Sequence, residues 1–109
     1  MKTTIMNWYL VDLMHLKDNS SKRLLRQILW GDLMADETGR FSAGDYVCTN
    51  FIDTREGNYF VTRSGSHYKC VGEEQHVEVD ILDLDILRKG VSPKQLAIIK
   101  VNIINEDSL

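Results

Sequence analysis

The side chains that could carry out chemistry in this sequence are two cysteines, three histidines and several pairs of carboxylates. His67 lies three residues before Cys70, and on a strand two residues so spaced point to opposite faces. Cys48 could lie beside a histidine, but nothing else in the sequence supports that pair. No CxxC pair and no Cys/His spacing typical of a metal site occurs. The sequence therefore predicts two free thiols in or near the core, and no metal site.

The carboxylate pairs have the positions of turn and helix-start charges rather than of an acid–base dyad. Asp83 and Asp85 stand where a helix is expected to begin, and Glu73 and Glu74 follow Gly72 in a turn. No glycine-rich phosphate loop, GxSxG or HExxH motif occurs. These observations predict a protein that is not an enzyme and needs no cofactor.

A binding surface has better support, on a hairpin predicted over residues 59–71. If Ser64-Gly65-Ser66 forms a three-residue loop, Arg63 lies opposite His67. Side-chain alternation then gives a core face of Phe60, Thr62, Tyr68 and Cys70, and an outer face of Tyr59, Val61, Arg63, His67, Lys69 and Val71.

The outer face of this hairpin combines tyrosine with cations, which is the composition of interface anchors. We expect a further cation from the preceding segment at its rim. The candidate binding residues are Arg55, Tyr59, Arg63, His67 and Lys69. The alternative is an ordinary solvated sheet face, and a two-residue turn would shift the register and disperse the cluster.

The charge of the chain is unevenly distributed. Its net charge of −3 disfavours a general nucleic-acid binder. Residues 1–72 hold nine Lys and Arg against eight Asp and Glu, whereas residues 73–109 hold four against eight. The acidic C-terminal third is either a solvated surface or, in place of the hairpin, the binding face, where it would imitate nucleic-acid phosphates.

The elements that must position these residues form a single domain over residues 1–109. Residues 5–16 fit a buried strand, with a helix as the alternative. A short helix is expected next, capped by Ser20 or Ser21, with an apolar face of Leu24, Leu25 and Ile28. An antiparallel meander follows, with a polar loop at 53–58 and strands over residues 46–52, 59–62, 67–71 and 76–81.

The C-terminal part is predicted to be helical. Asp83 can cap a short helix that ends with Gly90 at C′. Ser92-Pro93-Lys94-Gln95 is a capping box, in which Ser92 accepts from the N3 amide and Gln95 reaches back. The predicted fold class is α+β, an antiparallel sheet of four to five strands with a C-terminal helix and a short N-terminal helix.

Short motifs in residues 29–99 resemble those of a family of small uncharacterised phage and prophage proteins. They are Thr38-Gly39-Arg40-Phe41, Gly44-Asp45-Tyr46-Val47-Cys48-Thr49, Thr62-Arg63-Ser64-Gly65-Ser66-His67-Tyr68 and Leu87-Arg88-Lys89-Gly90-Val91-Ser92-Pro93. Asn50 stands where the pattern has Ser. The family has no assigned activity, so the resemblance carries over no functional residues. It implies a mobile-element origin and a protein that occupies a host protein, for example in a CRISPR or other defence system.

Residues 30–47 also resemble the opening of SH3-like small barrels, a likeness of fold alone. The predicted function is a non-enzymatic, phage-type protein-binding module that inhibits a host complex; the alternative is a nucleic-acid-binding small β domain that uses the hairpin face. With no apolar leader and no membrane-length apolar run, the predicted location is the cytoplasm, that of the host if a phage encodes the chain, with no membrane partner.

Overall fold

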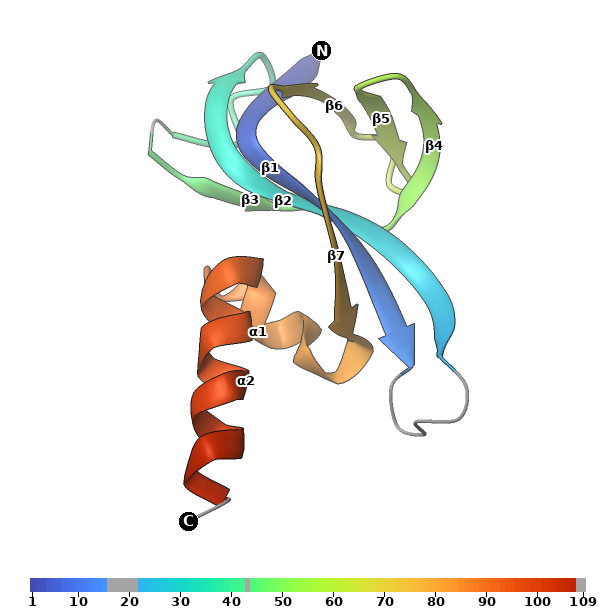
Figure 1. The fold of residues 1–109 in the computed structure, drawn as a ribbon. Coiled ribbons are helices and arrows are strands. Elements are labelled where there is room, and N and C mark those ends of the chain that lie inside the picture. Colours follow the sequence, from blue (N-terminus) through green and yellow to red (C-terminus); the bar gives the residue numbers. More distant parts are fainter. Residues whose placement is uncertain (16–21, 43, 108–109) are drawn as a thin grey trace.

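The computed structural model describes residues 1–15, 22–42 and 44–107, the last six of these by their backbone only. The seven described strands of a β-sheet come first in the chain, and the helical segments follow them at the C-terminal end of the chain (Figure 1). In chain order the elements are β1 (Lys2–His15), β2 (Arg23–Asp36), β3 (Tyr46–Cys48), β4 (Ile52–Glu56), β5 (Tyr59–Thr62), β6 (His67–Val71), β7 (Gln75–Asp80), the 3-10 turn η1 (Ile81–Asp83), α1 (Leu84–Arg88) and α2 (Pro93–Asp107). The α+β class is confirmed.

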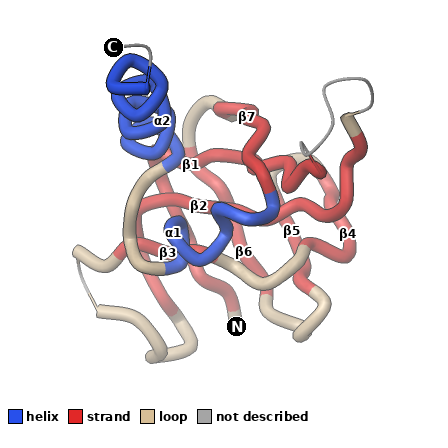
Figure 2. The backbone as a smooth tube through the Cα atoms, turned by 90° about the horizontal axis from the view of Figure 1, so that it is seen from below, coloured by secondary structure: helices blue, strands red, loops and turns tan. Residues whose placement is uncertain are grey.

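The long antiparallel hairpin of β1 and β2 is the spine of the sheet. The strand order is β3-β2-β1-β6-β5-β4, with β7 added to β1 outside that path. The first half of β1 pairs in parallel with β6, and its second half pairs in parallel with β7. Figures 1 and 2 show β7 running beside the lower half of β1, with α2 on its other side.

A bulge divides β1 into these two halves. Asn7 and Trp8 together oppose the single residue Gly31, because Met6 pairs with Asp32 and the next register pair is Tyr9 with Trp30. Asn7 has a φ of +48°, in the left-handed region that asparagine tolerates better than most residues. A Cβ at position 31 would lie 3.1 Å from the Met6 carbonyl oxygen, so glycine suits the close approach of the two strands.

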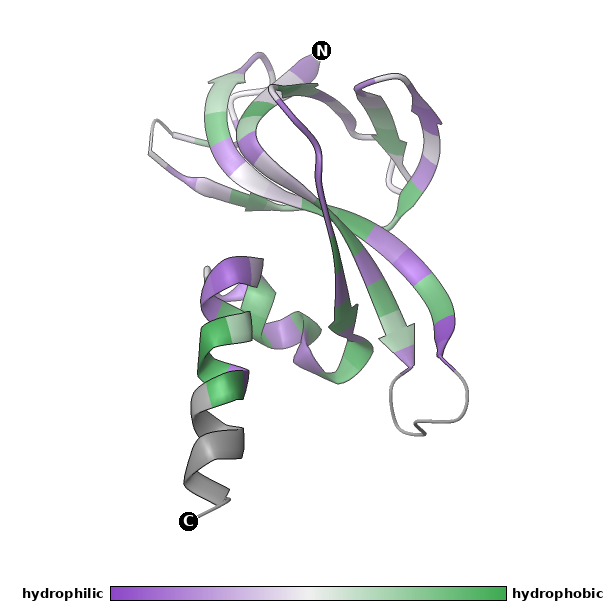
Figure 3. Cartoon of the chain, viewed as in Figure 1, coloured by the Kyte–Doolittle hydropathy of each residue, from purple (hydrophilic) through white to green (hydrophobic). Residues whose placement is uncertain are grey.

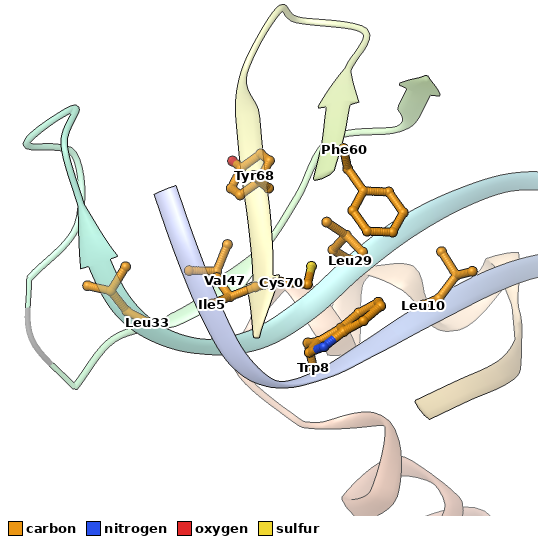
Figure 4. Packing of buried hydrophobic residues seen from close by; sticks show 9 residues of the cluster. All are labelled: Ile5, Trp8, Leu10, Leu29, Leu33, Val47, Phe60, Tyr68 and Cys70. Carbon is orange, nitrogen blue, oxygen red and sulfur yellow. The ribbon is translucent and has the colours of Figure 1, made fainter. Parts of the chain in front are cut away.

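The spine buries apolar side chains on both of its faces. Leu29 belongs to one cluster and its neighbour Ile28 to the other, as expected for successive residues of a strand. The first cluster lies under the β5–β6 hairpin (Figure 4) and contains Ile5, Trp8, Leu10, Leu29, Leu33, Val47, Phe60, Tyr68 and Cys70. The second lies between the helices and the part of the sheet where β1 pairs with β7. It contains Val11, Leu13, Ile28, Trp30, Val79, Leu87 and Leu96.

Two tryptophan side chains attach later parts of the chain to this spine. The Trp8 indole N–H donates to the Gly72 carbonyl at 3.2 Å, at the point where the chain passes from β6 to β7. The Trp30 indole N–H donates to the Leu87 carbonyl at 3.1 Å and so holds the end of α1. Both bonds satisfy a polar group that burial would otherwise leave unpaired.

The predicted short N-terminal helix is wrong, because Leu24, Leu25 and Ile28 belong to strand β2. Its proposed caps, Ser20 and Ser21, lie outside the described residues. Residues 28–31 are buried in succession because β2 is covered on both faces, and a strand of that kind loses its alternating pattern. For residues 5–16, strand rather than helix is found through His15.

The predicted loop at 53–58 and the predicted strand at 46–52 are also revised. Residues 52–56 form β4, so that β3 ends at Cys48, and the turn is reduced to Gly57 and Asn58. The meander ends at β6, since β7 pairs with β1 rather than with β6. The described residues contain seven strands instead of four or five, in an open sheet, and SH3-like barrel character stays a prediction.

The helix signals near the C-terminus are largely confirmed. The Gln95 N–H donates to the Ser92 hydroxyl at 3.1 Å, and the Ser92 N–H donates to the Gln95 Oε1 at 3.0 Å, which is the predicted capping box. Gly90 follows the C-cap of α1 with a φ of +106°. Asp83 stands at the N-cap of α1 but makes no capping bond; its carboxylate contacts the Lys100 ammonium instead, at 2.7 Å. None of the described helices is long and apolar enough to span a membrane.

Candidate functional site

The β5–β6 hairpin has the predicted faces but not the predicted register. Val61 rather than Arg63 pairs with His67, so the connection is longer than three residues. A shift by two residues leaves every side chain on its face. The four predicted core-face residues are buried: Phe60, Thr62, Tyr68 and Cys70.

The outer face of the hairpin brings Tyr59, His67 and Lys69 together. The Tyr59 hydroxyl lies 3.1 Å from His67 Nδ1, and the two rings meet edge to face with centroids 5.7 Å apart. Lys69 pairs with Tyr59 across the two strands and is exposed. Arg63 is exposed in the turn after β5, where its N–H donates to the Phe51 carbonyl at 2.8 Å.

Arg55 does not reach this face. It pairs with Phe60 across β4 and β5, and paired residues of an antiparallel ladder point to the same face, here the core face. Its guanidinium carbon lies 4.8 Å from the centroid of the Phe60 ring, and its Nη2 forms an ion pair with Glu74. Arg55 thus covers the core edge and is not a rim residue of the predicted cluster.

The two cysteines are free thiols, as the sequence predicts, with Cys70 buried and Cys48 half-buried. Burial raises the pKa of the Cys70 thiol to about 12, although nearby Arg55 opposes the shift. Burial likewise raises the pKa of the Cys48 thiol to about 11, against the influence of Arg88. At neutral pH both remain protonated, and a protonated thiol is a poor nucleophile.

Thr38-Gly39-Arg40-Phe41, the first of the motifs that resemble the phage family, lies in the turn that follows β2. The Asp36 carboxylate accepts hydrogen bonds from the Thr38 hydroxyl at 2.7 Å, from the Phe41 N–H at 2.9 Å and from the Thr3 hydroxyl at 2.8 Å. Burial acts to raise the pKa of Asp36, but these bonds and the Thr38 N–H together hold it well below its usual value. Arg40 Nη1 donates to the Ser66 hydroxyl at 3.2 Å and joins this turn to the hairpin loop.

A groove that sequence reasoning missed lies between β7 and α2. It has a volume of about 750 Å³. One wall is β7 with all five residues from His76 to Asp80, and the other is α2 with Pro93, Leu96, Ala97 and Lys100. Because consecutive residues of a strand point to opposite faces, a hollow lined by all five follows the edge of β7 rather than one of its faces.

The edge of β7 that lines this groove has no strand beside it in the described part of the chain. β7 pairs with β1 alone, whereas β5 and β6 each pair on both sides. A strand paired on one side presents backbone N–H and C=O groups on the other. Val77 and Val79 pack in the cluster under the helices, so the groove has an apolar floor beside these backbone groups.

The charged side chains around the groove are mostly acidic. Lys100 contacts Asp83, whose side chain is only 14% exposed, and the exposed Lys22 lies 3.5 Å from Glu78. His76 Nε2 lies 2.7 Å from a carboxylate oxygen of Asp12. The Asp80 carboxylate accepts from the Leu82 N–H at the start of η1.

Two other surfaces are notable. A smaller hollow of about 480 Å³ is lined by Phe41, Asp45, Tyr46, Cys48 and Arg88. On α2, Ile98, Ile99 and Val101 are exposed. Figure 3 colours the middle turns of that helix as hydrophobic. Among the described residues no three metal-ligating side chains gather in one place.

The part of this site that the sequence did indicate is the alternation of β7 and the acidity of residues 73–109. The groove itself depends on the pairing of β7 with β1, which are distant in the chain. No family model, curated protein or solved structure matches the chain. The resemblance to phage proteins therefore stays a prediction.

Proposed function

We propose that the chain is a non-enzymatic protein-binding module that takes up an extended segment of its partner in the β7–α2 groove. The segment would add a strand to the sheet at the edge of β7, with its backbone bonded to β7 and its alternate side chains on the groove floor. The observation that carries the proposal is a one-sided strand edge lying beside an apolar groove that a helix closes.

The dimensions fit such a segment. The six residues of β7 extend over about 20 Å at about 3.3 Å per residue. Residues 93–100 of α2 run about 12 Å along the opposite wall, at about 1.5 Å per residue. The groove volume of about 750 Å³ lies within the range of pockets that bury most of a ligand's surface. About four to six residues of a partner would be held.

The proposal extends to the biological role. The resemblance to phage proteins leads us to propose that the partner is a protein of a host complex, such as a CRISPR or other defence system. Residues 30–47, which resemble the opening of SH3-like barrels, would then belong to a small scaffold of that character. The high pKa values of both thiols support a role without covalent chemistry.

The experiment is to fill the groove from a position that holds no core contact. Ala97 lines the groove and is exposed, so Ala97→Trp would place an indole there without disturbing the core. Its control is Ile98→Trp, because Ile98 is 54% exposed on the same helix and does not line the groove. Peptides selected from a random displayed library on the wild-type protein would be measured against both variants.

We expect Ala97→Trp to lower the affinity for these peptides by about tenfold or more, since the indole occupies the space that a side chain of the segment needs. Ile98→Trp is expected to bind within about twofold of the wild type. Equal binding by all three proteins would contradict the proposal.

A nucleic-acid-binding domain is the second candidate, favoured by the exposed Arg63 and Lys69 on the hairpin. Phosphate contacts release counterions, so affinity for DNA or RNA would fall steeply between about 50 and 200 mM salt. A steep loss of affinity with salt, made shallower by Arg63→Glu, would favour nucleic-acid binding by the hairpin over peptide binding in the groove.

A further inference from the structure

We infer that the segment taken up in the groove alternates apolar with basic residues. The inference rests on the proposed function and adds the chemistry of the partner. It follows from the two faces of β7, one apolar and one acidic. The side chains of a strand added beside β7 would lie on these same two faces.

One face of an added strand would be apolar. Val77 and Val79 point to the side of β7 that carries the helices, and Leu96 and Ala97 line the groove across from them. A strand beside β7 places every second side chain on this side. These side chains would contact valine, leucine and alanine, so apolar residues fit there.

The other face would meet carboxylates. His76, Glu78 and Asp80 alternate with the two valines and therefore point to the opposite side of β7. Asp12 pairs with Glu78 across the ladder, which sets two carboxylates side by side. Opposite charges on neighbouring strands attract and like charges repel, so the segment's side chains on this face should be cationic.

The cations already present compensate the acidity of this face only in part. Lys22 is the counter-ion of Glu78, with 65% of its side chain exposed, and such a pair is weak in water. Glu74 has the Arg55 guanidinium as its partner, whereas Asp12 has only the His76 imidazole as an ion-pair partner among the described residues, at 2.7 Å. A lysine or arginine on the incoming strand would add the missing positive charge.

The test compares three synthetic peptides in which valine alternates with lysine, with serine or with glutamate, measured by fluorescence anisotropy at low salt. An alternating peptide can shift by one residue, so either starting register reaches the same faces. We expect the lysine peptide to bind about tenfold more tightly than the glutamate peptide, with the serine peptide between them. The difference should shrink in high salt.

Matched charge reversals locate the effect. Glu78→Lys should remove most of the preference for the lysine peptide, whereas Glu73→Lys, an equal change of charge at an exposed residue outside the groove, should keep it. Equal binding of the three peptides, all blocked by Ala97→Trp, would overturn the inference and leave the proposed function standing. A lysine preference that Ala97→Trp leaves unchanged, or no binding by any peptide, would overturn both.

Discussion

The β5–β6 hairpin and the β7–α2 groove are both built on short strands with alternating side chains, but they differ in what they leave open. On the hairpin the backbone is paired on both sides, and Tyr59 and His67 bond to each other. In the groove the backbone of β7 is paired on one side only, and apolar side chains lie beside the open edge. The comparison shows that side-chain composition alone indicates which surface has the residues of an interface. Sheet topology decides which strand has free backbone groups that a partner strand can pair with.

The largest loss of stability is expected from a substitution on the inner face of the hairpin. Phe60 is fully buried between Trp8 and the Arg55 guanidinium, so Phe60→Ala should lower the free energy of unfolding by about 3–5 kcal/mol. Tyr59→Ala, one residue away on the outer face, should cost less than about 1 kcal/mol. Urea denaturation measures both, and a loss for Tyr59→Ala as large as that for Phe60→Ala would show that the outer face is structural.

The next effect concerns α2, the helical wall that the groove has and the hairpin lacks. Ser92→Ala removes the hydroxyl that accepts the Gln95 N–H and should destabilise the protein by about 1 kcal/mol. Ser42→Ala is the control, because Ser42 is exposed and its hydrogen bonds with Asp45 come from its backbone N–H and carbonyl, which alanine keeps. An unchanged urea midpoint for Ser92→Ala would remove the capping box from the account of this wall.

The turn beside the hairpin should carry acid sensitivity. The pKa of Asp36 is lowered in the folded protein, so this carboxylate stabilises the fold above its usual pKa of 3.8. The stabilisation is lost as the pH falls through and below that value. Asp36→Asn should therefore reduce the slope of stability against pH in the acid range, measured from urea midpoints at successive pH values. An unchanged slope would contradict this role of the hydrogen bonds to Asp36.

The smallest effect is expected on the outer face of the hairpin. Arg63→Glu should change the affinity for groove peptides by less than about twofold, since Arg63 is exposed in a turn outside the groove. Fluorescence anisotropy with the lysine peptide measures it. A loss of about tenfold would return the binding site to the hairpin predicted from sequence.

The features that sequence predicted well are those set by neighbours in the chain. The faces of the hairpin follow from alternation, and the capping box at Ser92 follows from residue types at fixed spacing. Both depend on residues within a few positions of one another. The prediction of two free thiols in or near the core is also confirmed, since a free cysteine usually behaves as a small apolar residue.

The features that it missed depend on distant pairing. The spacing of Leu24, Leu25 and Ile28 predicts a short helix where the structure has the first half of β2. Residues 28–31 are all buried because this strand is covered on both faces, so no period of two is seen there. Arg55 was assigned to the outer face because β4 was read as a loop, so its pairing with Phe60 was unknown. The groove exists because the bulge at Asn7 divides β1 between β6 and β7.

The most direct test of the groove is to map amide NMR shifts of the protein during titration with the lysine peptide. The account predicts changes concentrated in β7, at Gln75–Asp80, and in residues 93–100 of α2, with protection of β7 amides from hydrogen exchange. The amides of β5 and β6 should change little. Shifts centred on residues 59–71, with β7 unaffected, would contradict the central claim.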